Sequence, residues 1–394
     1  MASVFLGRMI VALSFFAAIL SASAAYAVDF TTADSGPIAR YGGAPDGLKL
    51  RMTGMIEPGD GDKLRDILGR LAPQTSDKPR DILGTIELSS MGGNLSDGFQ
   101  IGMLLRKYNM IAVVRQRDIC MSSCALAFLG GNVHHVEAER RQECNLEIGG
   151  KVAFHNFFLN RNGLRETTSS DPVESRLQGF TDARGGAAML IKYASDLGLP
   201  PNFVASMMGR PVEEFQYIET VGQFLSFRVC PIGVDRPKIA IDMQARNVCS
   251  NSTGGSDTAS LVVTPIAQEK AKLYMLQRVQ ENMQSSKAKG RLAAQLTNGA
   301  VMRVKEEIDR LYDDLRAAGV ALPDIVGPTF EIGRKTAQAY EVSCYVSLSP
   351  NDPDNYDVVV QSARGLAEPP KLPPQNSRRL FLFDRGDVIN PRPR

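Results

Sequence analysis

Strand-like segments alternate with helix-like segments in the early part of the chain. Apolar strand patterns occupy residues 48–56, 82–88 and 110–115, and helical spacing of apolar residues occupies residues 63–71 and 96–108. Ser96 or Asp97 is a suitable N-cap for the second helix. Repeated strand–helix alternation favours a parallel sheet covered by helices, with crossovers of one hand. We therefore predict an α/β fold, whose binding sites gather at the carboxyl ends of the strands.

The N-terminal residues have the pattern of a secretory signal. Arg8 precedes an apolar run over residues 9–20, and Ala25-Tyr26-Ala27 forms a small-x-small cleavage site. This run is too short to predict a membrane span, and no later segment is long and apolar enough to cross a bilayer. We therefore predict that residues 1–27 are a cleaved signal peptide and that the mature protein, which starts at Val28, is soluble and exported. The cleavage pattern is typical of bacteria and indicates the periplasm.

A change of composition near Val248 divides the mature chain. Upstream of it, the pattern predicts helices at 186–198 and 203–208 and a strand at 224–229; downstream, amphipathic helices at 267–283 and 300–318 and a strand pair within 329–362. The tail is rich in Pro and Arg, which favours disorder. The predicted organisation is a main domain over 28–248, a linker over 249–262, a helical and α+β appendage over 263–366 and a disordered tail over 367–394.

Charge and cysteine content narrow the class of protein. The chain has 45 Lys and Arg against 43 Asp and Glu, dispersed along the sequence, so no nucleic-acid footprint is predicted. Six cysteines in an exported chain favour disulfides. Cys230 and Cys249 could close a local loop, and Cys144 could reach Cys120 or Cys124. Cys120 and Cys124, one helical turn apart, are more typical of structural cysteines than of nucleophiles. We predict at least one disulfide within the set Cys120, Cys124 and Cys144. The cysteines lack the tight paired spacing of zinc sites, so neither a metal nor another cofactor is predicted.

A serine, a histidine and a glycine pair each lie in or after a predicted strand. Ser122 precedes an apolar helical run, where helix N–H groups favour developing negative charge. Gly92, Gly93 and the backbone of Ser123 are candidate oxyanion donors, because glycine lets the backbone approach a substrate closely. His155 lies within a strand pattern over residues 151–158 and is the candidate base. The structural alternatives are a close-packed helix contact for Ser122 and a hydrogen-bonded core residue for His155.

The other two histidines are weaker candidates for the base. His134 and His135 are adjacent in a polar segment, which predicts that they face solvent.

Four short motifs occur in one order along the chain. They are Ser90-Met91-Gly92-Gly93, Cys120-Met121-Ser122-Ser123-Cys124, Phe128-Leu129-Gly130-Gly131 and Gly150-Lys151-Val152-Ala153-Phe154-His155. On these motifs, residues 48–234 resemble the Clp protease / crotonase superfamily, and most closely its secreted bacterial branch. The resemblance implies a spiral of strand-strand-helix repeats, a Ser–His–acid triad and assembly into rings. Met91 stands where the family has a proline.

The third member of the implied triad has no matching residue. The resemblance places an acid near Ser206-Met207-Met208-Gly209-Arg210, which contains neither Asp nor Glu. Glu213, Glu214, Asp196 and Asp171 are the substitutes, and the sequence does not choose among them.

Three functions follow from the resemblance. The favoured prediction is a serine-type peptidase in which Ser122 attacks a peptide or protein substrate and His155 is the base. The alternative is a catalytically inactive Clp-like scaffold that forms homo-oligomers or binds a partner in the cell envelope. Acyl-CoA chemistry, the crotonase reaction, is disfavoured because coenzyme A is scarce outside the cytoplasm.

Overall fold

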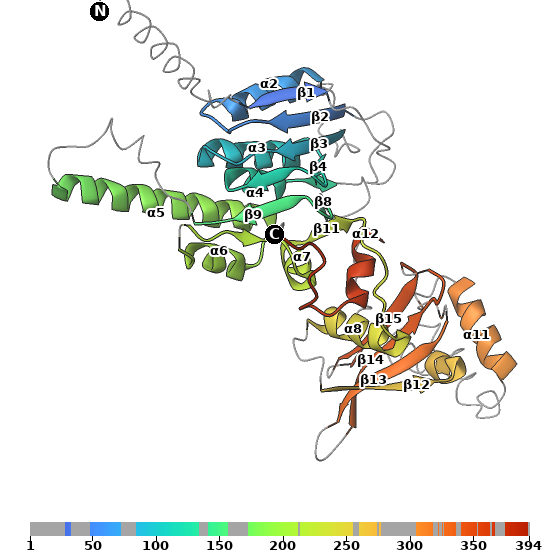
Figure 1. Cartoon of the computed structure of the whole chain (residues 1–394). Coiled ribbons are helices and arrows are strands. Elements are labelled where there is room, and N and C mark those ends of the chain that lie inside the picture. The colour runs from blue at the N-terminus through green and yellow to red at the C-terminus, as the bar shows by residue number, and fades with distance from the viewer. Residues whose placement is uncertain are drawn as a thin grey trace, which may run out of the picture. The chain divides into compact units, whose positions relative to one another are not determined.

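The structure is a computed structural model that divides into two compact units, described separately below (Figure 1). Unit 1 comprises Met1–Asn145 and Gly150–Tyr217, and unit 2 comprises Leu146–Gly149 and Ile218–Arg394. The residues that the structure describes are 28–32, 48–71, 84–133, 141–156, 172–211, 213–254, 260–273, 276, 305–317, 322, 325, 327–335, 340–352, 354–362, 365–366 and 375–392. The predicted signal peptide, 1–27, lies outside them, as do His134 and His135.

The first sheet of unit 1 has a parallel centre. Strand β1 (Asp29–Thr32) pairs antiparallel with β2 (Leu48–Thr53), and β2, β3 (Gly84–Ser89) and β4 (Met110–Val114) pair in parallel. Strand β8 (Cys144–Glu147) begins in unit 1 and ends in unit 2. All five residues of β4 are buried, as expected for a parallel strand that is covered on both faces. This arrangement confirms the predicted α/β class.

Three helices connect these strands. They are α2 (Asp60–Leu71), α3 (Leu95–Lys107) and the six-residue α4 (Ser123–Phe128). The prediction that Ser96 or Asp97 caps α3 is wrong: Asn94 is the N-cap, and its side chain accepts from the Asp97 N–H. The Asp97 carboxylate instead accepts from the N–H groups of Gly59 and Gly61, so it fastens the start of α2 to α3.

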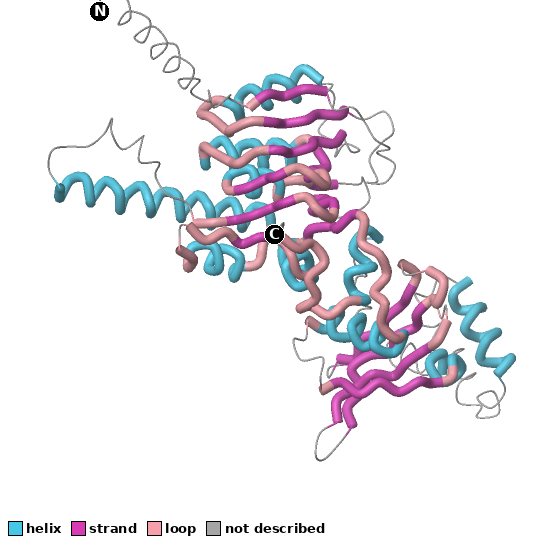
Figure 2. Tube along the Cα trace, in the orientation of Figure 1, coloured by secondary structure: helices cyan, strands magenta, loops and turns pink. Residues whose placement is uncertain are grey.

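Unit 1 also contains a second, smaller sheet of three strands, which are among the strands drawn in magenta in Figure 2. Its order is β10 (Gln216–Tyr217), β9 (Lys151–Phe154) and β5 (Ile119–Met121), with β5 and β9 parallel and β9 and β10 antiparallel. The other elements of unit 1 are β6 (Asn132–Val133), which pairs with β7 (Arg141–Gln142), the 26-residue helix α5 (Pro172–Leu197) and α6 (Pro201–Met208).

Unit 2 is built around a five-stranded antiparallel sheet. Its order is β12 (Leu261–Ile266), β13 (Thr329–Lys335), β14 (Tyr340–Leu348), β15 (Tyr356–Ser362) and β16 (Gly365–Leu366). The other elements are α7 (Val221–Phe227), β11 (Val229–Ile232), α8 (Ile241–Thr253), α11 (Lys305–Ala317), α12 (Gln375–Arg378) and the 3₁₀ helix η4 (Arg379–Leu382). The core of the unit joins α8 to the sheet through buried residues such as Val248, Ile332 and Val346.

Several predicted boundaries in this part of the chain differ from the structure. The predicted strand over 224–229 is mostly helix α7, because Thr220 and Gln223 form a capping box that starts a helix. The predicted linker begins inside α8, and the division between units falls at Tyr217/Ile218 rather than near Val248. Helix α11 confirms the predicted helix over 300–318, whereas most of the predicted helix over 267–283 lies outside the described residues.

The C-terminal tail also differs from the prediction of disorder. Leu380 and Leu382 are fully buried in unit 2. The side-chain amide of Asn247 donates to the Leu382 carbonyl, and that of Asn251 donates to the Phe381 and Phe383 carbonyls. These amides satisfy tail carbonyls that burial would otherwise leave without partners, so the described part of the tail, 375–392, is a folded part of unit 2.

In the described part of the chain, no helix combines the length and the apolar character that crossing a membrane demands.

Candidate active site

Ser122 lies at a sharp turn between strand β5 and helix α4. Its backbone has φ 56° and ψ −125°, a conformation that side-chain-bearing residues rarely adopt. The Ser122 N–H donates to the Ala153 carbonyl at 3.0 Å, and the Ser122 carbonyl accepts from the Leu126 N–H at 3.2 Å. Such a strained strand-to-helix turn is the usual setting of a nucleophilic serine in hydrolases with parallel sheets. The side chain of Ser122 is half-buried, so solvent reaches it.

His155 comes directly after strand β9, next to the end of β5. The two strands run parallel, with Met121 opposite Ala153, so the residues that follow them are at the same edge of the sheet. The Ser122 Oγ and His155 Nε2 atoms are 2.7 Å apart, a hydrogen-bonding distance. The imidazole is buried, and the ring of Phe215 contacts it with centroids 4.5 Å apart. A neutral imidazole with an unprotonated Nε2 can accept the hydroxyl proton of Ser122 at this distance.

The glycine pair lies on the other side of β5. Ser90 forms a parallel bridge with Cys120, so the segment after β3 runs beside β5 and ends at the same edge. Gly92 has φ 97°, and a Cβ atom on it would lie 2.6 Å from the Cβ of Ser122. Only glycine therefore allows this segment to approach the serine so closely.

The two glycines present different backbone groups. The Gly92 N–H donates to the hydroxyl of Ser90 at 3.1 Å and so already has an acceptor. Gly93 and Ile56 form a parallel bridge. In this bridge the Ile56 N–H donates to the Gly92 carbonyl, and the Asn94 N–H donates to the Ile56 carbonyl, so the bridge does not use the Gly93 N–H. Gly93 is therefore the stronger candidate of the pair for donating its N–H to an external acceptor.

Ser123 is the first residue of helix α4. First-turn N–H groups have no acceptor within their own helix, so the Ser123 N–H is a second candidate donor next to the hydroxyl of Ser122. The Ser123 side chain is buried, and among the described residues its hydroxyl has no hydrogen-bond partner. The candidate role of Ser123 thus rests on its backbone.

The segment where the resemblance implies an acid contributes backbone carbonyls near His155. The side-chain amide of Asn156, the next residue, donates to the carbonyls of Met208 and Arg210. The substitute carboxylates have other surroundings. Asp196 pairs with Lys192, Glu214 pairs with Arg210, Glu213 is exposed, and Asp171 lies outside the described residues.

The cysteines form two disulfides. Cys120 bonds to Cys124 across the Ser122 turn, which confirms the prediction of a bond within the set Cys120, Cys124 and Cys144. Cys249 bonds to Cys344, so the predicted loop between Cys230 and Cys249 is wrong.

The other two cysteines are buried outside these disulfides. The thiol of Cys144 donates to the Phe128 carbonyl at 3.0 Å and does not reach back to form a disulfide. Cys230 lies 3.1 Å from the hydroxyl of Ser377. Both thiols pack within their own unit, because Cys144 contacts unit 1 and Cys230 contacts unit 2.

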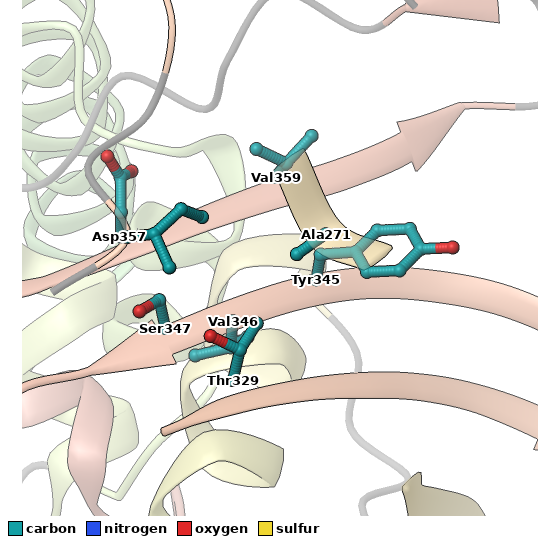
Figure 3. A pocket seen from close by; sticks show the side chains of 8 residues that line it. Ala271, Thr329, Tyr345, Val346, Ser347, Asp357 and Val359 are labelled. Carbon is teal, nitrogen blue, oxygen red and sulfur yellow. The ribbon is translucent and has the colours of Figure 1, made fainter. Parts of the chain in front are cut away.

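The sheet of unit 2 has a hollow of its own. Figure 3 shows a small hollow on the sheet of unit 2, where Ala271, Thr329, Tyr345 and Asp357 are among the lining residues. It contains no residue of the Ser122 site. Among the described residues, no three His, Cys, Asp or Glu side chains are grouped as a metal site requires.

No protein-family model matches the sequence, and no curated protein matches it significantly.

Proposed function

We propose that this protein is an exported serine hydrolase that cleaves peptide bonds with the pair Ser122 and His155. The observation that carries the proposal is the distance of 2.7 Å between Ser122 Oγ and His155 Nε2 at a serine with φ 56°. A strained turn costs roughly 1–3 kcal/mol and persists where the surrounding structure holds it, which is a frequent property of active sites. A structural serine needs neither this conformation nor a histidine partner.

The reaction follows the usual course of acyl transfer. As Ser122 Oγ attacks the carbonyl carbon of the substrate, its proton passes to His155 Nε2, and the carbonyl oxygen becomes an oxyanion. The N–H groups of Gly93 and Ser123 stabilise this oxyanion. His155 then gives its proton to the leaving amine nitrogen, and the C–N bond breaks to leave an acyl ester on Ser122.

Water completes the cycle. It attacks the acyl ester while His155 takes one of its protons, and the collapse of the second tetrahedral intermediate releases the carboxylic acid and restores the Ser122 hydroxyl. The packing of Phe215 against the imidazole supports the orientation of His155. Methionines beside the glycine pair, Met55 and Met91, are exposed and offer apolar contact to a substrate.

The finer points of fold and location are part of the proposal. We assign unit 1 to a Clp/crotonase-like spiral, because parallel strands with a glycine-pair turn, a serine turn and a histidine converge on one sheet edge. Two disulfides are typical of proteins that fold outside the reducing cytoplasm, which supports export to the periplasm.

A fluorophosphonate probe tests the proposed function. Such probes phosphonylate activated serines, so the wild type should gain one adduct, mapped by peptide mass spectrometry to Ser122. The Ser122→Ala variant should gain none, whereas Ser195→Ala, which removes an exposed hydroxyl on α5, should label like the wild type. Equal labelling of the wild type and Ser122→Ala, or no labelling of either, contradicts the proposal.

One observation favours the second candidate function, a scaffold that self-associates. Val173, Leu177 and Phe180 of helix α5 are spaced along one face and are between 61% and 71% exposed. Contiguous exposed apolar residues are typical of interaction sites. If this face joins copies of the chain, Leu177→Asp lowers the mass measured by light scattering. A mass that equals one chain in both proteins contradicts self-association.

A further inference from the structure

We propose that the Cys120–Cys124 disulfide holds Ser122 in its reactive conformation, so that both cysteines are positioning residues for the hydrolase reaction. This inference rests on the proposed function and extends it from the reacting groups to the covalent link that places them.

The disulfide closes a small loop around the nucleophile. Cys120 and Cys124 are four residues apart, with Cα atoms separated by 5.2 Å, and Ser122 is the middle residue between them. Cys120 is held in the middle of the sheet, because it bridges to Ser90 on one side and pairs with Val152 on the other. Cys124 is the second residue of α4. The bond therefore fixes the start of the helix to a strand that cannot move independently.

The turn needs such a link. Ser122 is one of only three described residues other than glycine with positive φ, and this conformation is unfavourable for a residue with a side chain. Helix α4 has six residues, too few to be stable without support from its surroundings. Two backbone hydrogen bonds, from Ser122 to Ala153 and from Leu126 to Ser122, act against the strain. The disulfide adds the covalent constraint, and both of its cysteines are fully buried.

The position of the bond also argues for a local role. A disulfide that closes a short loop removes little entropy from the unfolded chain, whereas one that closes a long loop removes more. The Cys249–Cys344 bond spans 95 residues, so it is the better placed of the two for overall stability. The Cys120–Cys124 bond is better placed to fix the geometry of one turn.

The first test compares two double variants in fluorophosphonate labelling. Cys120→Ala/Cys124→Ala should label Ser122 at least about 10-fold more slowly than the wild type, since small displacements of a reacting group are costly. Cys249→Ala/Cys344→Ala is the matched control, because it removes the other buried disulfide and leaves the Ser122 turn intact. It should label at the rate of the wild type while it remains folded. Equal slowing of both variants, or of neither, overturns the inference.

The second test separates positioning from a general structural effect. If the disulfide acts by keeping Ser122 near His155, its removal should slow labelling strongly when His155 is present and hardly at all in a His155→Ala background. A structural defect would slow labelling by the same factor in both backgrounds, and that result overturns the inference.

A reduction experiment avoids dependence on how the double variant folds. The folded Cys249→Ala/Cys344→Ala protein contains only the Cys120–Cys124 bond, which a phosphine reduces with two electrons to two thiols as the phosphine becomes its oxide. Labelling should slow as the two thiols appear and should recover after reoxidation. A rate that does not change with thiol content overturns the inference.

Hydrogen exchange distinguishes failure of this inference from failure of the proposed function. If the wild type does not label at all, the proposed function fails. The claim that the disulfide holds the Ser122 turn is then tested by the exchange rates of the backbone amides of Ser122 and Leu126. These amides should exchange faster in Cys120→Ala/Cys124→Ala than in the wild type and the control variant. Unchanged exchange overturns the claim that the bond holds this turn.

Discussion

The two units each contain one disulfide, but the two bonds close loops of very different length. In unit 1 the bond spans four residues around a strained serine at the edge of a sheet. In unit 2 the bond spans 95 residues and joins helix α8 to strand β14 in the centre of the core. Each unit also contains a buried tyrosine whose hydroxyl donates to a backbone carbonyl, Tyr193 in unit 1 and Tyr356 in unit 2. We therefore expect the bond in unit 1 to act on local geometry and the bond in unit 2 to act on overall stability.

The largest expected difference between the units is in reactivity. His155→Ala removes the base of the proposed reaction and should lower the rate of Ser122 labelling by about 10²–10⁴-fold. The control is Asn251→Ala in unit 2, which removes a buried amide with two hydrogen bonds and should leave the rate within about twofold. If the labelling rate falls equally in both variants, the claim that the reactive site belongs to unit 1 alone is contradicted.

The two disulfides should differ in their contribution to stability. From loop length alone, removal of Cys249–Cys344 should lower the free energy of unfolding by about 5 kcal/mol and removal of Cys120–Cys124 by about 2 kcal/mol. Denaturant unfolding of the two double alanine variants measures both values. A larger loss for the short loop would show that the bond in unit 1 is the main stabilising link, against our account.

Two glycines allow the surroundings of the backbone to be compared between the units. Gly92 in unit 1 and Gly233 in unit 2 both have positive φ, 97° and 86°, but a Cβ atom would clash with Ser122 only at Gly92 and would meet open space at Gly233. Both alanine variants should lose about 1–3 kcal/mol of stability from backbone strain. Only Gly92→Ala should also slow labelling, and normal labelling of a folded Gly92→Ala protein would contradict the close approach.

The smallest expected effect concerns the buried tyrosines. Burial raises the pKa of Tyr193 in unit 1 and of Tyr356 in unit 2. Because the folded state keeps these protons longer than the unfolded chain does, stability should fall as the pH rises above about 10, the ordinary tyrosine pKa. The double variant Tyr193→Phe/Tyr356→Phe should lose about 1 kcal/mol per hydrogen bond at neutral pH and show a shallower fall above pH 10. An unchanged pH dependence of denaturant unfolding would contradict the burial of both hydroxyls.

The meeting of Ser122 and His155 could be foreseen in outline from the order of the motifs. Strand β5, however, has only three residues and no periodic pattern, so the sequence does not reveal that it lies between Ser90 and β9. A positive φ is signalled by glycine, and Ser122 carries no such signal. The sequence also does not separate Gly92 from Gly93, because that depends on which N–H the hydroxyl of Ser90 accepts.

The tail shows why composition misleads in unit 2. Its prolines and arginines favour disorder, but Leu380 and Leu382 are fully buried, and Leu382 belongs to a core that includes residues as distant in sequence as Val248 and Ile332. The amides that bind the tail carbonyls come from Asn247 and Asn251, more than one hundred residues upstream. The Cys249–Cys344 pairing has the same character, since only the folded sheet brings these two cysteines together. Contacts between residues that are about one hundred positions apart produce no local sequence pattern from which they could be predicted.

The most direct test of the central claim is a crystal structure of the protein after reaction with a fluorophosphonate. Our account predicts phosphorus bonded to Ser122 Oγ, with a phosphonyl oxygen that accepts hydrogen bonds from the N–H groups of Gly93 and Ser123 and with His155 Nε2 beside the adduct. An adduct on another residue, or an oxygen on Ser122 that points away from both N–H groups, would contradict it.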